Sequence, residues 1–276
     1  YVIYDAQYGS RQINVKLIHS NGENVWDSTL IITENSGIGM GRSFQASKIQ
    51  NNQLCISWYG DPDSNMQQDV FAQVVTLQGT CRYADGGLNL SPNTSVNQTS
   101  IQFAGEDENN NTVFVWQENN TIKLQKADTA GQLLHSAGGL TVISQNVETL
   151  KKSKYVLGKT YMHFKETSSN KANTGIYHHD DDSLQIKSVD SYSDIMSDFK
   201  NGQFVFASSY ETNTYSHIHL QNCYRNGKKG VSPIIKDCEL YSLAGIKGFR
   251  PDSVFYYQNA DTPLNWQSFY QPVNIY

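Results

Sequence analysis

Four segments of the chain repeat one pattern of hydrophobic and polar positions over ten residues. Each begins with Ile or Val, has an apolar residue at its third position and ends at Gly, over residues 13–22, 70–79, 122–131 and 218–227. Apolar residues at alternate positions are typical of a β-strand, and the closing Gly suits a turn that requires a positive φ angle. Three copies have Gln at the fourth position, Gln73, Gln125 and Gln221. The pattern therefore predicts a repeated strand that ends in a tight turn.

A short apolar segment precedes each of these four copies. Two more precede a degenerate copy at residues 175–186 and the C-terminal end of the chain. The apolar segments are residues 2–4, 54–58, 113–116, 161–164, 204–207 and 254–257. Beyond the Gly, Trp26, Tyr83 or His135 follows four residues later and leads into a further strand. Most of the apolar segments also follow another candidate strand. Four antiparallel strands in about 40–50 residues make a β-propeller blade, which must stack against its neighbours to bury both faces.

We therefore predict an all-β protein, a single β-propeller domain of four-stranded antiparallel blades. Six blades are expected, with an incomplete first or last blade; five blades plus a C-terminal extension is the alternative. The expected blades are residues 1–40, 41–98, 99–150, 151–192, 193–243 and 244–276. Only Tyr1 precedes the second strand of the first blade, so its inner strand would come from upstream sequence, from residues 271–276 or from another copy of the protein.

The repeat resembles those of secreted β-propeller proteins, in which a strand containing Gln leads to a Gly turn, a Trp and a Gly-Gly pair. The residues that carry the resemblance are Gln73, Gln125, Asp128, Gly131, Trp26 and Gly138–Gly139. The resemblance spans most of the chain. It implies an architecture and no particular activity.

Composition narrows the partners and the location. The charged fraction is 17% and the net charge is -5, which provides no basic surface for nucleic acid. No apolar run approaches the ~18 residues of a membrane span. Asn-x-Ser/Thr sequences at Asn89, Asn93, Asn97, Asn110 and Asn119, together with an even number of cysteines, favour an extracellular or cell-surface protein. The start at Tyr1 suits a processed chain or a fragment.

Of the glycosylation sequences, Asn93, Asn97, Asn110 and Asn119 are expected to carry glycans, because Asn89 lies within a predicted strand. Disulfides are expected within blades. Blades two and five would lie across the ring, beyond the ~7 Å limit between Cα atoms, so the predicted pairs are Cys55–Cys81 and Cys223–Cys238.

One loop has the spacing of a calcium site. Asp61, Asp63, Asn65 and Asp69 occupy positions 1, 3, 5 and 9 of residues 61–69, and Ca²⁺ prefers oxygen ligands. The loop resembles the calcium cage of integrin-type propeller blades, although Met66 stands where that cage has Gly. A solvated hairpin loop without metal is the other interpretation. No further cofactor is expected.

No catalytic motif is recognised, and the chain is expected not to be an enzyme. The first functional interpretation is an extracellular structural or adhesive module that associates with copies of itself, with other extracellular proteins or with glycans. The alternative is a carbohydrate-binding, lectin-like propeller, since Tyr and Trp with Asn and Gln suit sugars. A glycan-active enzyme is the third.

Overall fold

The computed structural model describes residues 2–6, 12–32, 44–60, 67–92, 96–144, 146–167, 172–189, 194–200, 203–211, 216–224, 234–238, 243–250, 253–259 and 266–272. Within these ranges the chain is strand and turn, apart from one short 3-10 helix, Gln50–Asn52. No helix in them is long and apolar enough to cross a membrane.

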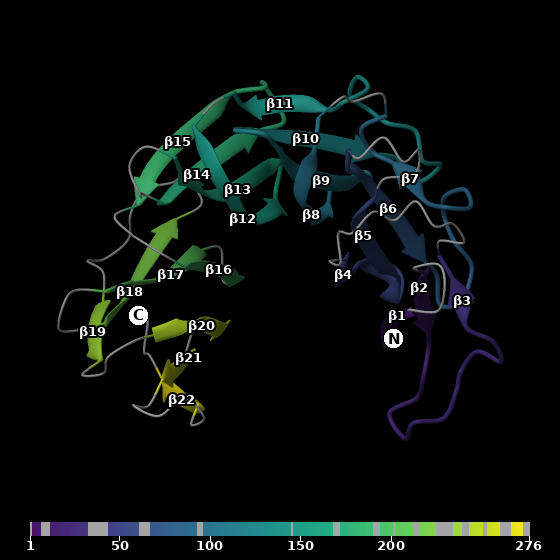
Figure 1. The fold of residues 1–276 in the computed structure, drawn as a ribbon. Coiled ribbons are helices and arrows are strands. Elements are labelled where there is room, and N and C mark those ends of the chain that lie inside the picture. Colours follow the sequence, from purple (N-terminus) through teal and green to yellow (C-terminus); the bar gives the residue numbers. More distant parts are fainter. Residues whose placement is uncertain are drawn as a thin grey trace. The chain divides into compact units, whose positions relative to one another are not determined.

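The described strands form six antiparallel sheets, here called blades 1 to 6 in chain order (Figure 1). Blade 1 consists of β1 (Val2–Ala6), β2 (Gln12–Lys16) and β3 (Leu30–Ile31). Blade 2 consists of β4 (Phe44–Lys48), β5 (Leu54–Gly60), β6 (Asp69–Val75) and β7 (Leu88–Asn89). Blade 3 consists of β8 (Gln98–Glu106), β9 (Thr112–Glu118), β10 (Thr121–Ala127) and β11 (Leu140–Ile143). Blade 4 consists of β12 (Val147–Val156), β13 (Lys159–Glu166), β14 (Ala172–His178) and β15 (Leu184–Val189). Blade 5 consists of β16 (Asp194–Lys200), β17 (Gln203–Glu211), β18 (Ser216–Tyr224) and β19 (Ile234–Cys238). Blade 6 consists of β20 (Leu243–Arg250), β21 (Ser253–Asn259) and β22 (Trp266–Pro272).

The predicted all-β fold of four-stranded antiparallel sheets is confirmed. Strands follow one another across each sheet in chain order, and the predicted apolar segments lie in β1, β5, β9, β13, β17 and β21. In blade 3, Val113–Trp116 of β9 are fully buried on both faces. A strand that is apolar without alternation is one covered on both sides, as a blade between two neighbours requires.

The Gln of the repeat holds the loop that follows the repeated strand. In blade 2, Gln73 Nε2 donates to the carbonyls of Tyr83 and Ala84, while its Oε1 accepts from the backbone N–H of Tyr83 and Val74. Gln125 makes the same four contacts in blade 3, at residues 135, 136 and 126. Both amides are fully buried and fully used, so this Gln serves the fold.

The Gly-Gly pair of the repeat makes room for the Trp of the second strand. Gly139 has a φ of 73°, and a Cβ there would lie 2.5 Å from Trp116 Cη2 and 2.9 Å from the Leu124 carbonyl. Gly87 stands in the same relation to Trp58 in blade 2. Only Gly tolerates both the backbone angle and the approach of the ring.

The aromatic residue after each Gly turn reaches the Gly turn of the next blade. Trp26 of blade 1 covers Gly79 of blade 2, where a Cβ would lie 3.2 Å from the ring, and its Nε1 donates to the Leu77 carbonyl at 2.8 Å. Tyr83 of blade 2 covers Gly131 of blade 3 in the same way. These contacts, and the apolar clusters of Val15 with Ile56 and of Val74 with Phe114, join consecutive blades.

The chain divides into two compact units. The first is Tyr1–Tyr161 with Tyr177–Ser183, and the second is Met162–Ile176 with Leu184–Tyr276. The contacts of the candidate site described below lie within the first unit.

Candidate functional site

The predicted calcium loop falls mainly on residues outside the described ranges, Asp61, Asp63 and Asn65 among them. Asp69 is described: it begins β6, and Asn89 Nδ2 lies 3.4 Å from its Oδ2. Among described residues, no group of three or more His, Cys, Asp or Glu side chains could hold a metal ion. Calcium binding stays a prediction.

The predicted disulfides are contradicted. Cys55 and Cys81 are free; Cys55 lies opposite Val74 and Cys81 opposite Val75. Successive residues of a strand point to opposite faces, so the two thiols lie on opposite faces of blade 2.

In blade 5, Cys238 lies opposite Ser216, seven positions before Cys223 on β18. At ~3.3 Å per residue this places Cys238 roughly 23 Å from Cys223, well beyond disulfide reach. Two cysteines of one blade can form a disulfide only where the strand register brings them together, and here it does not.

The predicted glycan acceptors lie in loops between strands where the structure describes them. Asn97, Asn110 and Asn119 are exposed, and Asn110 and Asn119 have positive φ angles. Asn93 lies outside the described residues. Glycosylation itself stays a prediction.

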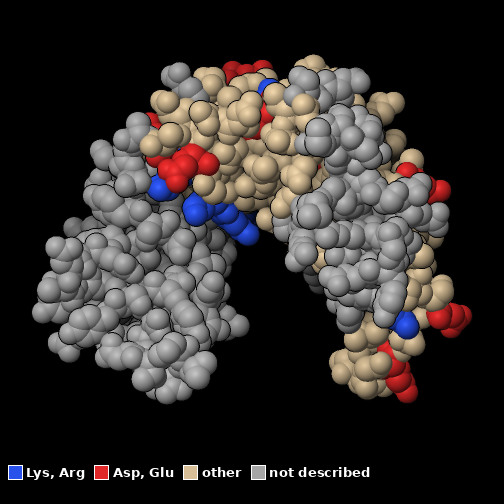
Figure 2. Space-filling model, viewed as in Figure 1, with Lys and Arg blue, Asp and Glu red and all other residues tan. Residues whose placement is uncertain are grey.

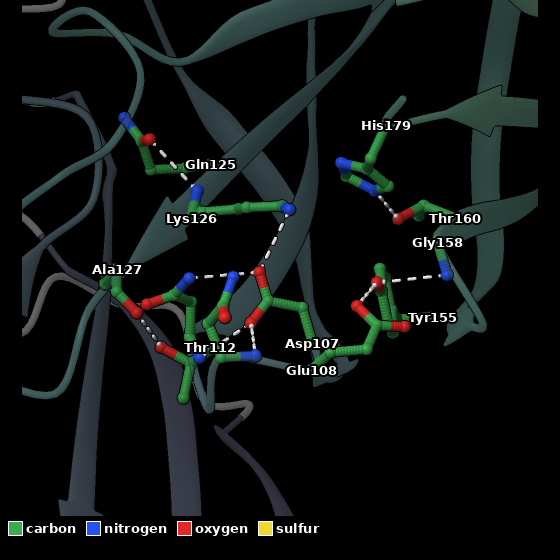
Figure 3. Close-up of polar contacts among 12 residues, drawn as sticks. Asp107, Glu108, Thr112, Gln125, Lys126, Ala127, Tyr155, Gly158, Thr160 and His179 are labelled. Carbon is green, nitrogen blue, oxygen red and sulfur yellow. Dashed lines mark hydrogen bonds and ion pairs between the residues drawn. The ribbon is translucent and has the colours of Figure 1, made fainter. Parts of the chain in front are cut away.

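A different cluster of polar side chains lies where blade 3 meets β12 of blade 4 (Figure 3). It begins at Asp107 in the turn between β8 and β9. The Asp107 carboxylate accepts from the backbone N–H of Asn109 and Asn111, from Asn111 Nδ2 at 3.0 Å and from Lys126 Nζ at 3.1 Å. Burial alone would raise the pKa of Asp107, but the hydrogen bonds from Asn111, Lys126 and Asn109 outweigh it and hold that pKa below its ordinary value.

The Asp107–Lys126 ion pair occupies positions that are apolar in blade 2. The turns correspond through the same backbone hydrogen bond, Asp107 N to Asn111 O and Ile49 N to Gln53 O. Lys126 follows Gln125 as Val74 follows Gln73. Ile49 and Val74 belong to one apolar cluster, whereas the side chains of Lys126 and Asp107 are only 14% and 4% exposed. Blade 3 thus has a largely buried ion pair where the repeat accommodates an apolar pair.

Tyr155 of β12 forms the opposite side of the cluster. Its hydroxyl donates to Glu108 Oε2 at 2.6 Å and accepts from Gly158 N at 3.0 Å, and Lys126 Nζ lies 5.8 Å from its ring centre. The hydrogen bond from Tyr155 holds the pKa of the exposed Glu108 below its ordinary value. Burial, and then Glu108, raise the pKa of Tyr155. Both groups therefore keep their usual charge at neutral pH.

Two imidazoles complete the cluster. His179 Nε2 lies 2.8 Å from Thr160 Oγ1, and its ring is 5.3 Å from that of Tyr155 and 4.8 Å from that of Tyr177. Burial, Lys126 and His135, in decreasing order, lower the pKa of His179 to about 4. Burial and Lys126 also lower the pKa of His135, whose buried Nε2 has no hydrogen-bond partner among the described residues. Both imidazoles are therefore neutral at pH 7.

The cluster offers both hydrogen-bond donors and hydrogen-bond acceptors. Lys126 has three N–H donors, of which the described part of the chain takes one. His135 adds an imidazole nitrogen without a partner there, and Glu108 adds exposed carboxylate oxygens beside the Tyr155 ring. Glycoside hydrolysis requires one carboxylic acid that stays protonated, and the lowered pKa values of Asp107 and Glu108 do not provide it in this pair. The arrangement suits recognition of a polar, uncharged ligand.

The sequence does not predict this cluster as a site, and His135 stands out there only as part of the repeat. The signal that could have found it is the difference between copies: Lys126 against Val74 and Leu17, and His135 against Trp26 and Tyr83.

Comparison with protein-family models and with curated proteins gives no match. Among solved structures, the β-propeller domain of the trilobed protease from Pyrococcus furiosus is similar, with a TM-score of 0.51 and 7% identity over 84% of this chain and 69% of that one. A family 117 glycoside hydrolase from Zobellia galactanivorans has a TM-score of 0.48 and 10% identity, over 86% and 85% of the two chains. The catalytic domain of a family 62 α-L-arabinofuranosidase from Coprinopsis cinerea has a TM-score of 0.46 and 8% identity, over 86% of this chain and 92% of that one.

These comparisons correct two functional expectations. Several of the similar structures are glycoside hydrolases, so a missing sequence motif was insufficient ground for expecting that the chain is not an enzyme, and that expectation is withdrawn. An adhesive or structural role finds no support among them. Identities of 7% to 11% establish the fold and no activity. The fold is a β-propeller.

Proposed function

We propose that the protein recognises carbohydrate through the polar cluster at the junction of blades 3 and 4. The observation that carries the proposal is the Asp107–Lys126 pair, which stands where blade 2 has Ile49 and Val74. Replacing a buried ion pair by apolar residues is often neutral or stabilising, by about 1–4 kcal/mol. Stability alone therefore does not account for a charged pair at this point of the repeat.

The chemistry around the pair suits a sugar. Sugar hydroxyls both donate and accept hydrogen bonds, and their ring faces are apolar enough to lie against aromatic side chains. Lys126 supplies donors and the exposed Glu108 supplies acceptors, and the buried Tyr155 holds the Glu108 carboxylate in place. His135 and His179 can each donate or accept, because both are held neutral. Carbohydrates are also the first ligands to test because the structures compared above include glycoside hydrolases.

The test is binding of neutral oligosaccharides to the intact chain, first on a glycan array and then by calorimetry. Lys126→Val introduces the blade 2 residue at the same repeat position and is expected to fold normally while the affinity falls at least about tenfold. Tyr155→Phe removes one hydroxyl and is expected to weaken binding by several fold. Lys123→Gln is the matched control, because Lys123 lies on the same strand as Lys126 but pairs with Glu118 of β9.

Two results would overturn the proposal. One is a wild-type chain that binds no neutral glycan on the array. The other is a Lys126→Val variant that binds as tightly as the wild type.

A further inference from the structure

The strand that supplies Tyr155 also has the densest basic run in the described part of the chain. β12 contains Lys151, Lys152 and Lys154 within four residues, although the protein as a whole has a net charge of -5. Figure 2 shows Lys and Arg side chains gathered where Figure 1 places β12. β12 is also an edge strand, because its sheet continues only through β13.

Lys152 and Lys154 share one face of β12. They are two positions apart, so their Cα atoms lie roughly 6–7 Å from each other on the same side. Tyr155 is on the other face, toward blade 3, where a Cβ on Gly105 would lie 3.1 Å from Tyr155 Cβ. The lysine pair is therefore separate from the Asp107–Lys126 cluster, although both lie along the same strand.

Neither Lys152 nor Lys154 has an ion-pair or hydrogen-bond partner among the described residues. Both described ion pairs involve other lysines, Lys123 and Lys126. Lys152 is exposed and Lys154 is partly buried. Two like charges on one face of a strand repel each other. An anion bound between the two ammonium groups would relieve this repulsion.

We infer that β12 binds the anionic groups of an acidic polysaccharide, its carboxylates or sulfates, through Lys152 and Lys154. This inference rests on the proposed carbohydrate recognition and names the ligand class: a glycan with repeated negative charges whose neutral part reaches the Tyr155 side of the strand. Two adjacent ammonium groups suit a polymer in which anions recur along the chain better than they suit a single small anion.

The experiment compares ligands that differ in charge. Calorimetry or fluorescence titration of the intact chain would use an oligogalacturonate, a heparin oligosaccharide, a neutral oligosaccharide of similar length and single-stranded DNA. The Lys152→Gln/Lys154→Gln variant is expected to bind the anionic oligosaccharide it prefers about tenfold more weakly at low salt. The difference should shrink as salt is raised, because salt screens exposed charges. Lys123→Gln is again the control, and an unchanged urea midpoint checks that the variant folds.

The outcomes separate this inference from the proposed function. Weaker anionic binding in the double variant, with neutral binding intact, supports it; the oligogalacturonate and heparin arms distinguish carboxylate from sulfate. Equal anionic binding by wild type and variant, or wild-type preference for DNA, overturns the inference while neutral binding that depends on Lys126 still stands. Neutral binding that is unchanged by Lys126→Val overturns the proposed site, whereas anionic binding that is lost in the double variant still leaves the lysine site standing.

Discussion

A double-mutant cycle on Asp107 and Lys126 tests whether the two side chains act as one buried pair. Lys126→Met removes a hydrogen bond between charged groups, 3.1 Å long, but leaves Asp107 its donors from Asn109 and Asn111. Such bonds contribute about 1.5–3 kcal/mol, so we expect a loss near the lower end. Asp107→Asn keeps the turn but leaves the Lys126 side chain, which is 14% exposed, without its carboxylate partner. We expect this to lower the free energy of unfolding by about 2 kcal/mol.

The double variant is the informative one. Once either partner is gone, removal of the other costs little, so we expect a loss of about 2 kcal/mol and a coupling energy of about 1–2 kcal/mol. The assay is urea unfolding followed by tryptophan fluorescence, with equal m-values as the check that the same transition is measured. Asp107→Asn combined with Lys123→Met is the control pair and should be additive. Additivity within about 0.5 kcal/mol for Asp107 and Lys126 would refute the reasoning.

Three further predictions concern the histidines, the glycines and the thiols. The folded chain keeps His179 neutral down to about pH 4, because its pKa is lowered to that value, whereas the unfolded chain takes up the proton near pH 6.5. The free energy of unfolding should therefore fall by about 1–2 kcal/mol as the pH drops from 6.5 to 4, after allowance for the partial exposure of the ring. Urea midpoints against pH should show a flatter slope for His179→Asn than for the wild type; an unaltered slope would contradict this. Gly139→Ala should destabilise the chain by about 2–4 kcal/mol, because its Cβ meets Trp116, whereas Gly138→Ala, with open space around it, should cost only about 1 kcal/mol; equal thermal shifts would count against the steric argument. A thiol reagent should find four reactive cysteines after denaturation. In the native chain the half-buried Cys81 should react before Cys55, whose complete burial raises its pKa. A count of only two reactive thiols after denaturation would show that a disulfide is present.

The fold could be predicted because its determinants recur. The Gln that holds the loop, the Gly-Gly pair beside the Trp and the Gly at positive φ each appear in two or three copies. A residue type that returns at a fixed interval shows its role by repetition alone, even before its contacts are known.

The candidate site could not be predicted because its members occur once. Asp107 and Lys126 are 19 residues apart and meet only through the register of β8, β9 and β10. Tyr155 comes from another blade. The disulfide prediction failed for a related reason: it placed Cys55 and Cys81 in one sheet but not on its faces, which the alternation along β6 decides.

The contact between an aromatic ring and the Gly turn of the next blade gives the chain a direction. Each such blade offers a ring on one side and accepts one on the other, as Trp26 meets Gly79 and Tyr83 meets Gly131. A duplicated blade inserted between two of these would therefore find a matching surface on both sides, which makes growth by duplication feasible. At the third step His135 replaces the Trp or Tyr, and the next turn, residues 179–183, has no Gly. The series of ring contacts is interrupted at that junction, which is free to diverge toward a ligand.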